Sequence, residues 1–159
     1  MDARTTLLAA LQPVLDRLAQ LDPADPGLAD RLDAELPVDG GALAEIAALV
    51  RAGAEEGWLA PKGGPGLAFG RVSKPVPESR DFSVDAVVMN RPGPGHVHPR
   101  GEIDLCFALS GDPRFDGRPA GWVVYPPGSW HVPTVTGGEM AILYFLPGGA
   151  FQMAAEPPA

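Results

Sequence analysis

The chain has 159 residues, of which 45% are hydrophobic and 20% are charged, so it can bury a sizeable core and has the composition of a soluble globular protein. Its net charge of −8 argues against nucleic acid or an anionic membrane surface as a partner, because both attract basic patches. No apolar run has the length of a membrane span, the first residues lack a secretory signal, and a single cysteine excludes an internal disulfide, which together favour the cytoplasm.

The chain begins with apolar residues at helical spacing. Residues 5–21 carry a stripe of leucine and valine, which predicts an amphipathic helix. Pro13 lies inside this stretch and is expected to kink the helix or restart it. A short second helix is predicted over 26–35, with Asp25 as its N-cap.

A longer helix is predicted over 41–57, with Asp39 as its cap and Gly57 at its end. No residue in the helical part of the chain argues for chemistry. We therefore interpret residues 1–60 as a helical N-terminal extension, which covers one face of a β-barrel or forms a dimer contact. Because its apolar surface suits self-association, a homodimer is predicted.

The hydrophobic period changes from 3.6 to 2 after the turn-rich segment 62–66. Glycine and proline separate nearly all of the strands that follow. These candidate strands are 67–72, 82–90, 103–110, 120–126, 131–136 and 139–146. Many short strands joined by such turns predict a mainly β domain over 66–150, built as a sandwich or a small barrel.

The chain contains only three histidines, and their spacing is informative. His96 and His98 stand two apart, so in a strand their imidazoles point to the same side, and Glu102 has the same parity. His131 follows about one hairpin later. Three neutral imidazoles and a carboxylate suit a divalent transition metal such as iron, manganese, zinc or nickel. The alternative is three ordinary surface or core histidines.

This spacing resembles the two motifs of the cupin superfamily. His96, His98 and Glu102 match the first motif, His-x-His-x-x-x-Glu, and the segment 126–131 matches the second, Pro-x-Gly-x-x-His. Gly111 stands later after the glutamate than the closing glycine of the first motif usually does. The resemblance implies a single-domain jelly-roll barrel with these four side chains as metal ligands.

A finer resemblance extends over nearly the whole chain and is to the 4-hydroxylaminobenzoate lyase family. The segments that carry it are 101–109, 111–115, 121–124, 131–135 and 142–149. It implies a metal-dependent lyase of nitroarene breakdown, which converts 4-hydroxylaminobenzoate and water to 3,4-dihydroxybenzoate and ammonia. The implied partner is a small aromatic carboxylate, and no external redox cofactor is needed because cleavage of the N–O bond balances oxidation of the ring.

Two aspartates are candidates for proton transfer. The alternation that points Glu102 inward also points Asp104 and Cys106 inward. Asp104 could orient a histidine ligand or act as a general acid or base, or its carboxylate could be satisfied by local backbone. Asp85 interrupts an apolar strand and could line the same pocket. No basic group lies near Cys106 in sequence, so inert packing is favoured for its thiol.

A binding site for an aromatic carboxylate also needs a cationic side chain and aromatic side chains along its walls. Among the arginines near strand ends, Arg71 is the first choice, since a guanidinium binds a carboxylate through two hydrogen bonds. Tyr125, Trp130 and Tyr144 are predicted to supply aromatic walls or core.

Two other functions stay open for a cupin of this kind, because the fold alone does not choose one. They are an iron-dependent dioxygenase acting on a small aromatic molecule and a non-catalytic protein that binds a small ligand.

Overall fold

Four short α-helices precede the strands in the computed structural model, which describes residues 1–159. The helices are α1 (Ala3–Ala10), α2 (Gln12–Leu18), α3 (Leu28–Glu35) and α4 (Ala44–Glu56), with two single 3-10 turns, η1 (Gly41–Leu43) and η2 (Pro77–Ser79). The strands are β1 (Lys62–Gly64), β2 (Leu67–Ser73), β3 (Phe82–Met89), β4 (His96–His98), β5 (Glu102–Phe115), β6 (Gly121–Tyr125), β7 (Ser129–His131), β8 (Val135–Pro147) and β9 (Gln152–Met153).

Pro13 restarts the first helix instead of kinking it. α1 ends at Ala10, and α2 begins at Gln12 with Pro13 in its first turn, where a missing backbone N–H breaks no helical bond. The leucine stripe continues across this break: Leu7 and Leu11 are fully buried, as are the leucines of α2 that follow at helical spacing. The periodicity therefore predicted the buried face correctly although the helix is in two pieces.

The helix predicted over 41–57 is present, but it begins with η1 and continues as α4. Asp39 does not cap it, because neither η1 nor α4 has a side-chain cap. Gly57 ends α4 at a positive φ of 88°, as its lack of a side chain favours. α3 begins later than predicted, and Asp25 instead accepts a hydrogen bond from the Gly27 N–H at 2.9 Å in the preceding turn.

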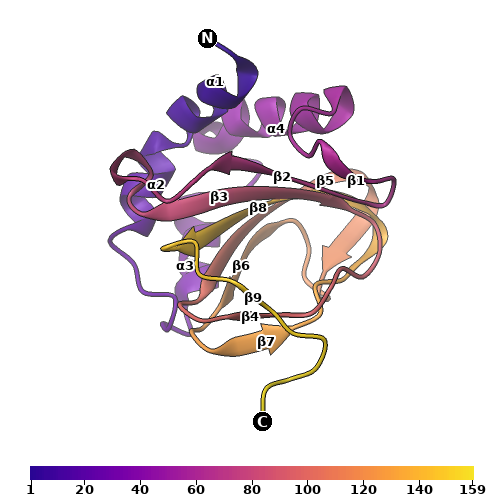
Figure 1. Ribbon diagram of the computed structural model, residues 1–159. Helices are drawn as coiled ribbons and strands as arrows, with labels where there is room; N and C mark the ends of the chain where they lie inside the picture. Colours follow the sequence, from indigo (N-terminus) through magenta and orange to yellow (C-terminus); the bar gives the residue numbers. More distant parts are fainter.

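Two antiparallel sheets form the rest of the molecule and confirm the mainly β prediction. The large sheet has the strand order β1-β2-β3-β8-β5-β6, and the small sheet has the order β7-β4-β9. The large sheet lies between the helices on one side and the small sheet on the other (Figure 1). The two sheets therefore enclose an interior, as in the jelly-roll arrangement that the cupin resemblance implied.

Two predictions around the strands need correction. The segment 62–66 was predicted to be a turn-rich linker, but its first part forms β1 against β2. The strand predicted over 131–136 is wrong, because His131 ends β7 in the small sheet and Val135 begins β8 in the large one. Pro133 lies between them and has no N–H to donate to a ladder, and the N–H of Thr134 binds a carboxylate instead.

Separate apolar clusters fill the two sides of the large sheet. On the outer side the leucine stripe of α1 and α2 packs with Ile46 of α4 and with Phe107 and Phe145 of the sheet. On the inner side Cys106 and Ile142 belong to the second cluster. The helices therefore cover one face of the sheet, which was the first of the two alternatives for this segment.

The leucine stripe is not available for the predicted homodimer, because the same chain buries it. The boundaries 1–60 and 66–150 stay predictions, and the shared outer cluster shows that the helical part is packed as a layer of the fold. None of the helices has both the length and the apolar character that crossing a membrane would require.

Candidate metal centre

The four predicted ligands come from three strands and meet between the two sheets. β4 presents His96 and His98 on one face, and β7 pairs with it antiparallel so that His131 is the direct partner of His96. The chain then turns at Gly101, which has a φ of 88°, and enters the large sheet with Glu102 as the first residue of β5. The small sheet therefore supplies the imidazoles, and the large sheet supplies the carboxylate.

The ligand atoms of these four residues lie within 4.8 Å of one another. Glu102 Oε1 is 3.4 Å from His96 Nε2, and Glu102 Oε2 is 3.2 Å from His98 Nε2 and 3.7 Å from His131 Nε2. The Nε2 atoms of His96 and His131 are 3.1 Å apart. Three nitrogens and two oxygens thus surround one point.

The other ring nitrogen of each histidine has a partner outside the cluster. His96 Nδ1 is 3.3 Å from the Pro94 carbonyl oxygen, and His131 Nδ1 is 2.7 Å from Asp116 Oδ2. Both partners accept hydrogen bonds, so each Nδ1 carries a proton, which leaves Nε2 as the ring nitrogen available to a metal.

The same tautomer follows for the remaining histidine. His98 Nδ1 is 2.9 Å from the hydroxyl oxygen of Ser129, and that hydroxyl donates its own proton to the Pro126 carbonyl at 2.6 Å. The Ser129 oxygen must therefore accept from His98. All three imidazoles therefore present Nε2 to the same point, and Nε2 is the ring nitrogen that a metal would bind.

Burial makes the cluster a good fit for a cation. His98 and Glu102 are fully buried, and His96 is nearly so. His98 Nε2 and both carboxylate oxygens of Glu102 have no hydrogen-bond partner. Because unpaired buried polar atoms are costly, this arrangement suggests a metal site, and nitrogen with oxygen donors suits a divalent transition ion.

Two buried carboxyl groups lie next to each other on β5 and differ in charge. Burial by itself would raise the pKa of Glu102, but the close approach of its oxygens to the Nε2 atoms of His96 and His98 outweighs burial and lowers that pKa. Burial and the neighbouring Glu102 charge both raise the pKa of Asp104 well above its ordinary value. The shared site therefore favours the ionised form of Glu102 and shifts Asp104 toward its protonated form.

The inner face of the large sheet carries a row of polar side chains beside this centre. Arg71 on β2 pairs with Asp85 on β3, which pairs with Tyr144 on β8, which in turn pairs with Asp104 on β5. Direct partners in antiparallel strands point to the same face, so these four residues form one row, which we call the polar row. The structure therefore brings together the predicted cation, both predicted proton-transfer groups and one predicted aromatic wall.

The two aspartates of the polar row have different surroundings. Asp85 Oδ1 accepts from Arg71 Nε at 2.8 Å, and its Oδ2 accepts from the Ser83 hydroxyl at 2.8 Å. Asp104 is fully buried, and neither of its carboxyl oxygens has a conventional donor. The alternative that local backbone satisfies Asp104 is therefore wrong. The Arg71 side chain is 50% exposed, which leaves the end of its guanidinium open to solvent.

The three predicted aromatic walls divide into two groups. Tyr125 stacks on His98 with ring centroids 5.2 Å apart, and its ring lies 4.2 Å from that of His131. Tyr144 is buried in the inner cluster. Trp130 lies between Ser129 and His131 on β7, so it points away from the centre, and its indole N–H donates to the Ala154 carbonyl at 2.8 Å. Trp130 packs against the C-terminal segment and does not line the centre.

Three residues near the centre did not stand out in the sequence. Asp116 and Ser129 hold the Nδ1 atoms of two histidines, and Phe151 lies with its ring 4.5 Å from that of His96. Phe151 is 42% exposed, and it immediately precedes β9, which pairs with β4. These residues lie in turns and at a strand end, where no periodic pattern marks a side chain as facing inward.

Cys106 is buried as predicted, and burial raises the pKa of its thiol.

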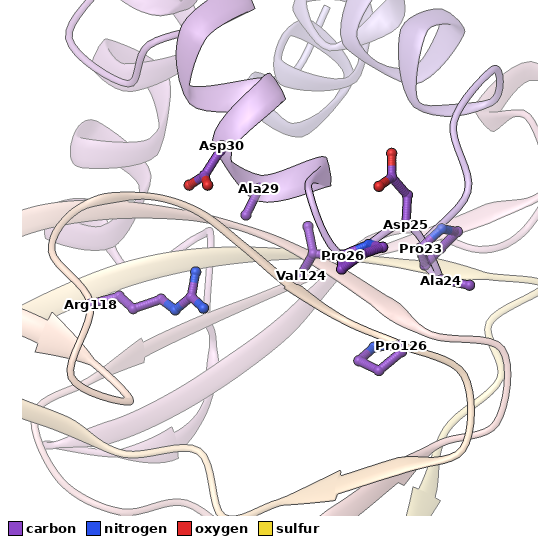
Figure 2. Close-up of a pocket in the computed structure, with 9 residues that line it drawn as sticks. All are labelled: Pro23, Ala24, Asp25, Pro26, Ala29, Asp30, Arg118, Val124 and Pro126. Atoms are coloured by element: carbon purple, nitrogen blue, oxygen red, sulfur yellow. The ribbon is translucent and has the colours of Figure 1, made fainter.

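A pocket of about 270 Å³ lies outside the barrel and has no part in this centre (Figure 2). It lies between the loop before α3 and the outer side of β6, and its lining includes Pro23, Arg118 and Val124. Val124 is adjacent to Tyr125 in β6, so it points to the opposite side of that strand from the histidines. None of the four clustered residues lines this pocket.

Comparison with known proteins agrees with this architecture. The family model described as "PnbB: 4-hydroxylaminobenzoate lyase" matches residues 9–153. A 4-hydroxylaminobenzoate lyase of Nocardioides sp. (strain LMS-CY) is 33% identical over 124 residues, which span 72% of this chain and 73% of the relative. A 4-hydroxylaminobenzoate lyase of Pseudomonas putida is 32% identical over 123 residues, which span 66% of this chain and 70% of the relative.

Among solved structures, the DMSP lyase DddQ from Ruegeria pomeroyi DSS-3 aligns over 99% of this chain and 98% of its own, with a TM-score of 0.45 and 17% identity. That likeness is too low to support a functional argument. The family match covers the four clustered residues and both sheets, and the two curated relatives are enzymes. The chain is therefore an enzyme and belongs to the 4-hydroxylaminobenzoate lyase family.

Proposed function

We propose that this protein is a metal-dependent lyase that converts a hydroxylamino-aromatic acid and water to a catechol acid and ammonia, with 4-hydroxylaminobenzoate as the substrate and 3,4-dihydroxybenzoate as the product. The observation that carries the proposal is the convergence of three imidazole Nε2 atoms and the Glu102 carboxylate in a buried site. The names of the two relatives support the choice of substrate.

The proposed ligands are His96, His98, Glu102 and His131, and the ion is iron, manganese, zinc or nickel. When bound, such an ion supplies Lewis acidity toward the hydroxylamino oxygen of the substrate. The protein holds three neutral donors and one anionic donor, so the loaded centre keeps a net positive charge. That charge suits an oxygen that leaves as hydroxide. Metal analysis of the purified protein identifies the ion.

The polar row supplies the remaining groups that the reaction needs. Arg71 is proposed to bind the substrate carboxylate through the exposed end of its guanidinium, while its Nε stays on Asp85. Tyr144 and Tyr125 are proposed to flank the aromatic ring. As the N–O bond breaks, the ring becomes electron-poor and accepts water beside the nitrogen. Hydrolysis at the carbon that carries nitrogen then releases ammonia.

Asp104 is the favoured proton-transfer residue, and Asp85 is the second candidate. Both oxygens of Asp85 already accept hydrogen bonds, whereas those of Asp104 have no conventional donor. Replacing Asp104 with Asn removes the acidic proton and keeps the shape of the side chain. We expect Asp104→Asn to lower kcat by about 10²–10⁴-fold, the usual contribution of a positioned acid or base. Steady-state kinetics at constant metal content measures this effect.

Asp85→Asn is the matched control, because it makes the same change in another strand of the polar row. It weakens the contact with Arg71, so we expect it to raise KM more than it lowers kcat. If Asp85→Asn lowers kcat by the larger factor and Asp104→Asn does not, the proton-transfer role belongs to Asp85.

The reaction itself is tested with purified, metal-replete protein and 4-hydroxylaminobenzoate. We expect ammonia and 3,4-dihydroxybenzoate in equal amounts, at the same rate with and without oxygen, because the N–O bond is the oxidant. Consumption of oxygen would support the dioxygenase alternative instead. Binding of the aromatic acid without any product would support a non-catalytic ligand-binding protein.

We also infer a cytoplasmic homodimer. A single buried cysteine requires no oxidising compartment. Light scattering of the purified protein tests the dimer, and a mass of one chain would reject it. The contact must use a surface other than the leucine stripe, which the same chain buries.

A further inference from the structure

Asp116 lies in the turn that follows β5 and is held there by one residue. Its backbone N–H donates to the Thr134 carbonyl at 2.9 Å, and its Oδ1 accepts from the Thr134 N–H at 2.9 Å. Its φ of 50° lies in the left-handed region, which aspartate and asparagine tolerate better than most residues. These two bonds fix both the backbone and the carboxylate of Asp116 before any ligand arrives.

The second oxygen of Asp116 faces the histidine cluster. Asp116 Oδ2 accepts from His131 Nδ1 at 2.7 Å and also from the Tyr125 hydroxyl. An ionised carboxylate only accepts hydrogen bonds, so it selects the tautomer of His131 whose proton is on Nδ1. In that tautomer the Nε2 lone pair faces the other three clustered residues.

The other two histidines have weaker or neutral partners. His98 is tied to the hydroxyl of Ser129, and His96 Nδ1 is 3.3 Å from the Pro94 carbonyl. His131 alone is tied to a carboxylate, and it is also the most exposed of the three, with 10% of its side chain accessible. His131 is therefore the least shielded of the three from solvent, and its orientation alone is set by a hydrogen bond to a carboxylate.

We propose that Asp116 is a positioning residue that fixes the tautomer and ring orientation of His131, so that Nε2 is ready to bind the metal. Asp116 does not touch the ion; it acts through His131. This inference rests on the metal centre of the proposed function. It adds a fifth residue, from a turn between two strands of the large sheet, to a site whose ligands come from β4, β5 and β7.

The test is Asp116→Asn in the full-length protein. Asparagine tolerates the φ of 50° and can still accept from the Thr134 N–H, but its amide group then replaces Oδ2 and donates toward His131. A donor opposite Nδ1 favours the tautomer with its proton on Nε2, which blocks the ligand atom. We expect the affinity for Co²⁺, measured by titration of its visible absorption bands, to fall by about 10–100-fold.

A second readout separates positioning from general damage to the fold. Nitrogen NMR of the imidazoles in the metal-free protein reports the tautomer directly. We expect the Nδ1–H form of His131 in the parent and the Nε2–H form in Asp116→Asn. Asp112→Asn is the matched control, because it removes the same charge from an exposed site four residues earlier, within β5, and it should match the parent in both measurements.

Parent-like affinity and tautomer in Asp116→Asn would overturn the inference, as would an equal loss of Co²⁺ affinity in Asp112→Asn. A parent protein that binds no Co²⁺ would instead reject the metal centre itself.

Discussion

His98→Ala is expected to eliminate metal binding and, with it, turnover of the aromatic substrate. The His98 ring is fully buried, its Nε2 is 3.2 Å from Glu102, and this nitrogen has no hydrogen-bond partner. Loss of an outer partner of a ligand typically costs about 10–100-fold in metal affinity, and loss of the ligand itself costs more. Without the ion the N–O bond lacks an electrophile, so the rate should fall to that of the substrate in solution.

The measurement is metal content per chain after purification, together with ammonia release. Val97→Ala is the matched control: Val97 lies beside His98 on β4 but points to the other face of the strand, so its loss should leave the bound metal unchanged. Circular dichroism of both variants checks that the sheets are intact. A His98→Ala protein that retains the parent's metal would show that these four side chains are not the ligands.

Removal of the metal is expected to destabilise the folded protein strongly. In the metal-free chain both oxygens of Glu102 are buried without a hydrogen-bond partner, and burial of an ionised carboxylate is costly. An ion that binds only the native state stabilises it by about 4 kcal/mol when present at about 1,000 times its Kd. For a chain of this length each kcal/mol shifts Tm by about 2–4 °C.

We therefore expect a chelator to lower Tm by about 8–16 °C, as measured by scanning calorimetry under saturating and metal-free conditions. The His98→Ala variant is the control, because a protein that binds no ion should show the same Tm with and without chelator. An unchanged Tm in the parent would mean that the cluster holds no ion in the native state. Zinc, manganese and iron added back one at a time should restore the parent Tm to different extents.

The sequence predicted those parts of the fold that depend on residues close together in the chain. The leucine spacing of residues 5–21 predicted a buried helical face, and Pro13 predicted a break in it. His96 and His98 are two apart in a strand, so they point to one side wherever that strand lies. These predictions succeeded because backbone geometry alone relates neighbours three, four or two positions apart.

The sequence did not predict features that depend on the packing of distant segments. A strand over 131–136 seemed continuous, yet the chain leaves one sheet and enters the other between His131 and Val135. Trp130 was predicted as an aromatic wall or core residue, but it alternates with the inward His131 on β7, and its indole donates to the Ala154 carbonyl outside the centre. Local alternation already excluded it from the centre once His131 was placed there, whereas the change of sheet after His131 is decided by the whole barrel.

The sequence by itself determined the chemical kind of the centre: three imidazoles and one carboxylate, at spacings that suit a metal. Only the tertiary structure decided that Asp116 accepts a hydrogen bond from His131 and that Arg71, Asp85 and Asp104 share one row of the inner face. The physical reason is the separation in sequence between the residues that each feature relates. Local periodicity records which side of a strand a residue occupies, whereas a hydrogen bond between a turn and a strand, or a row across four strands, exists only after sheet closure brings those segments together.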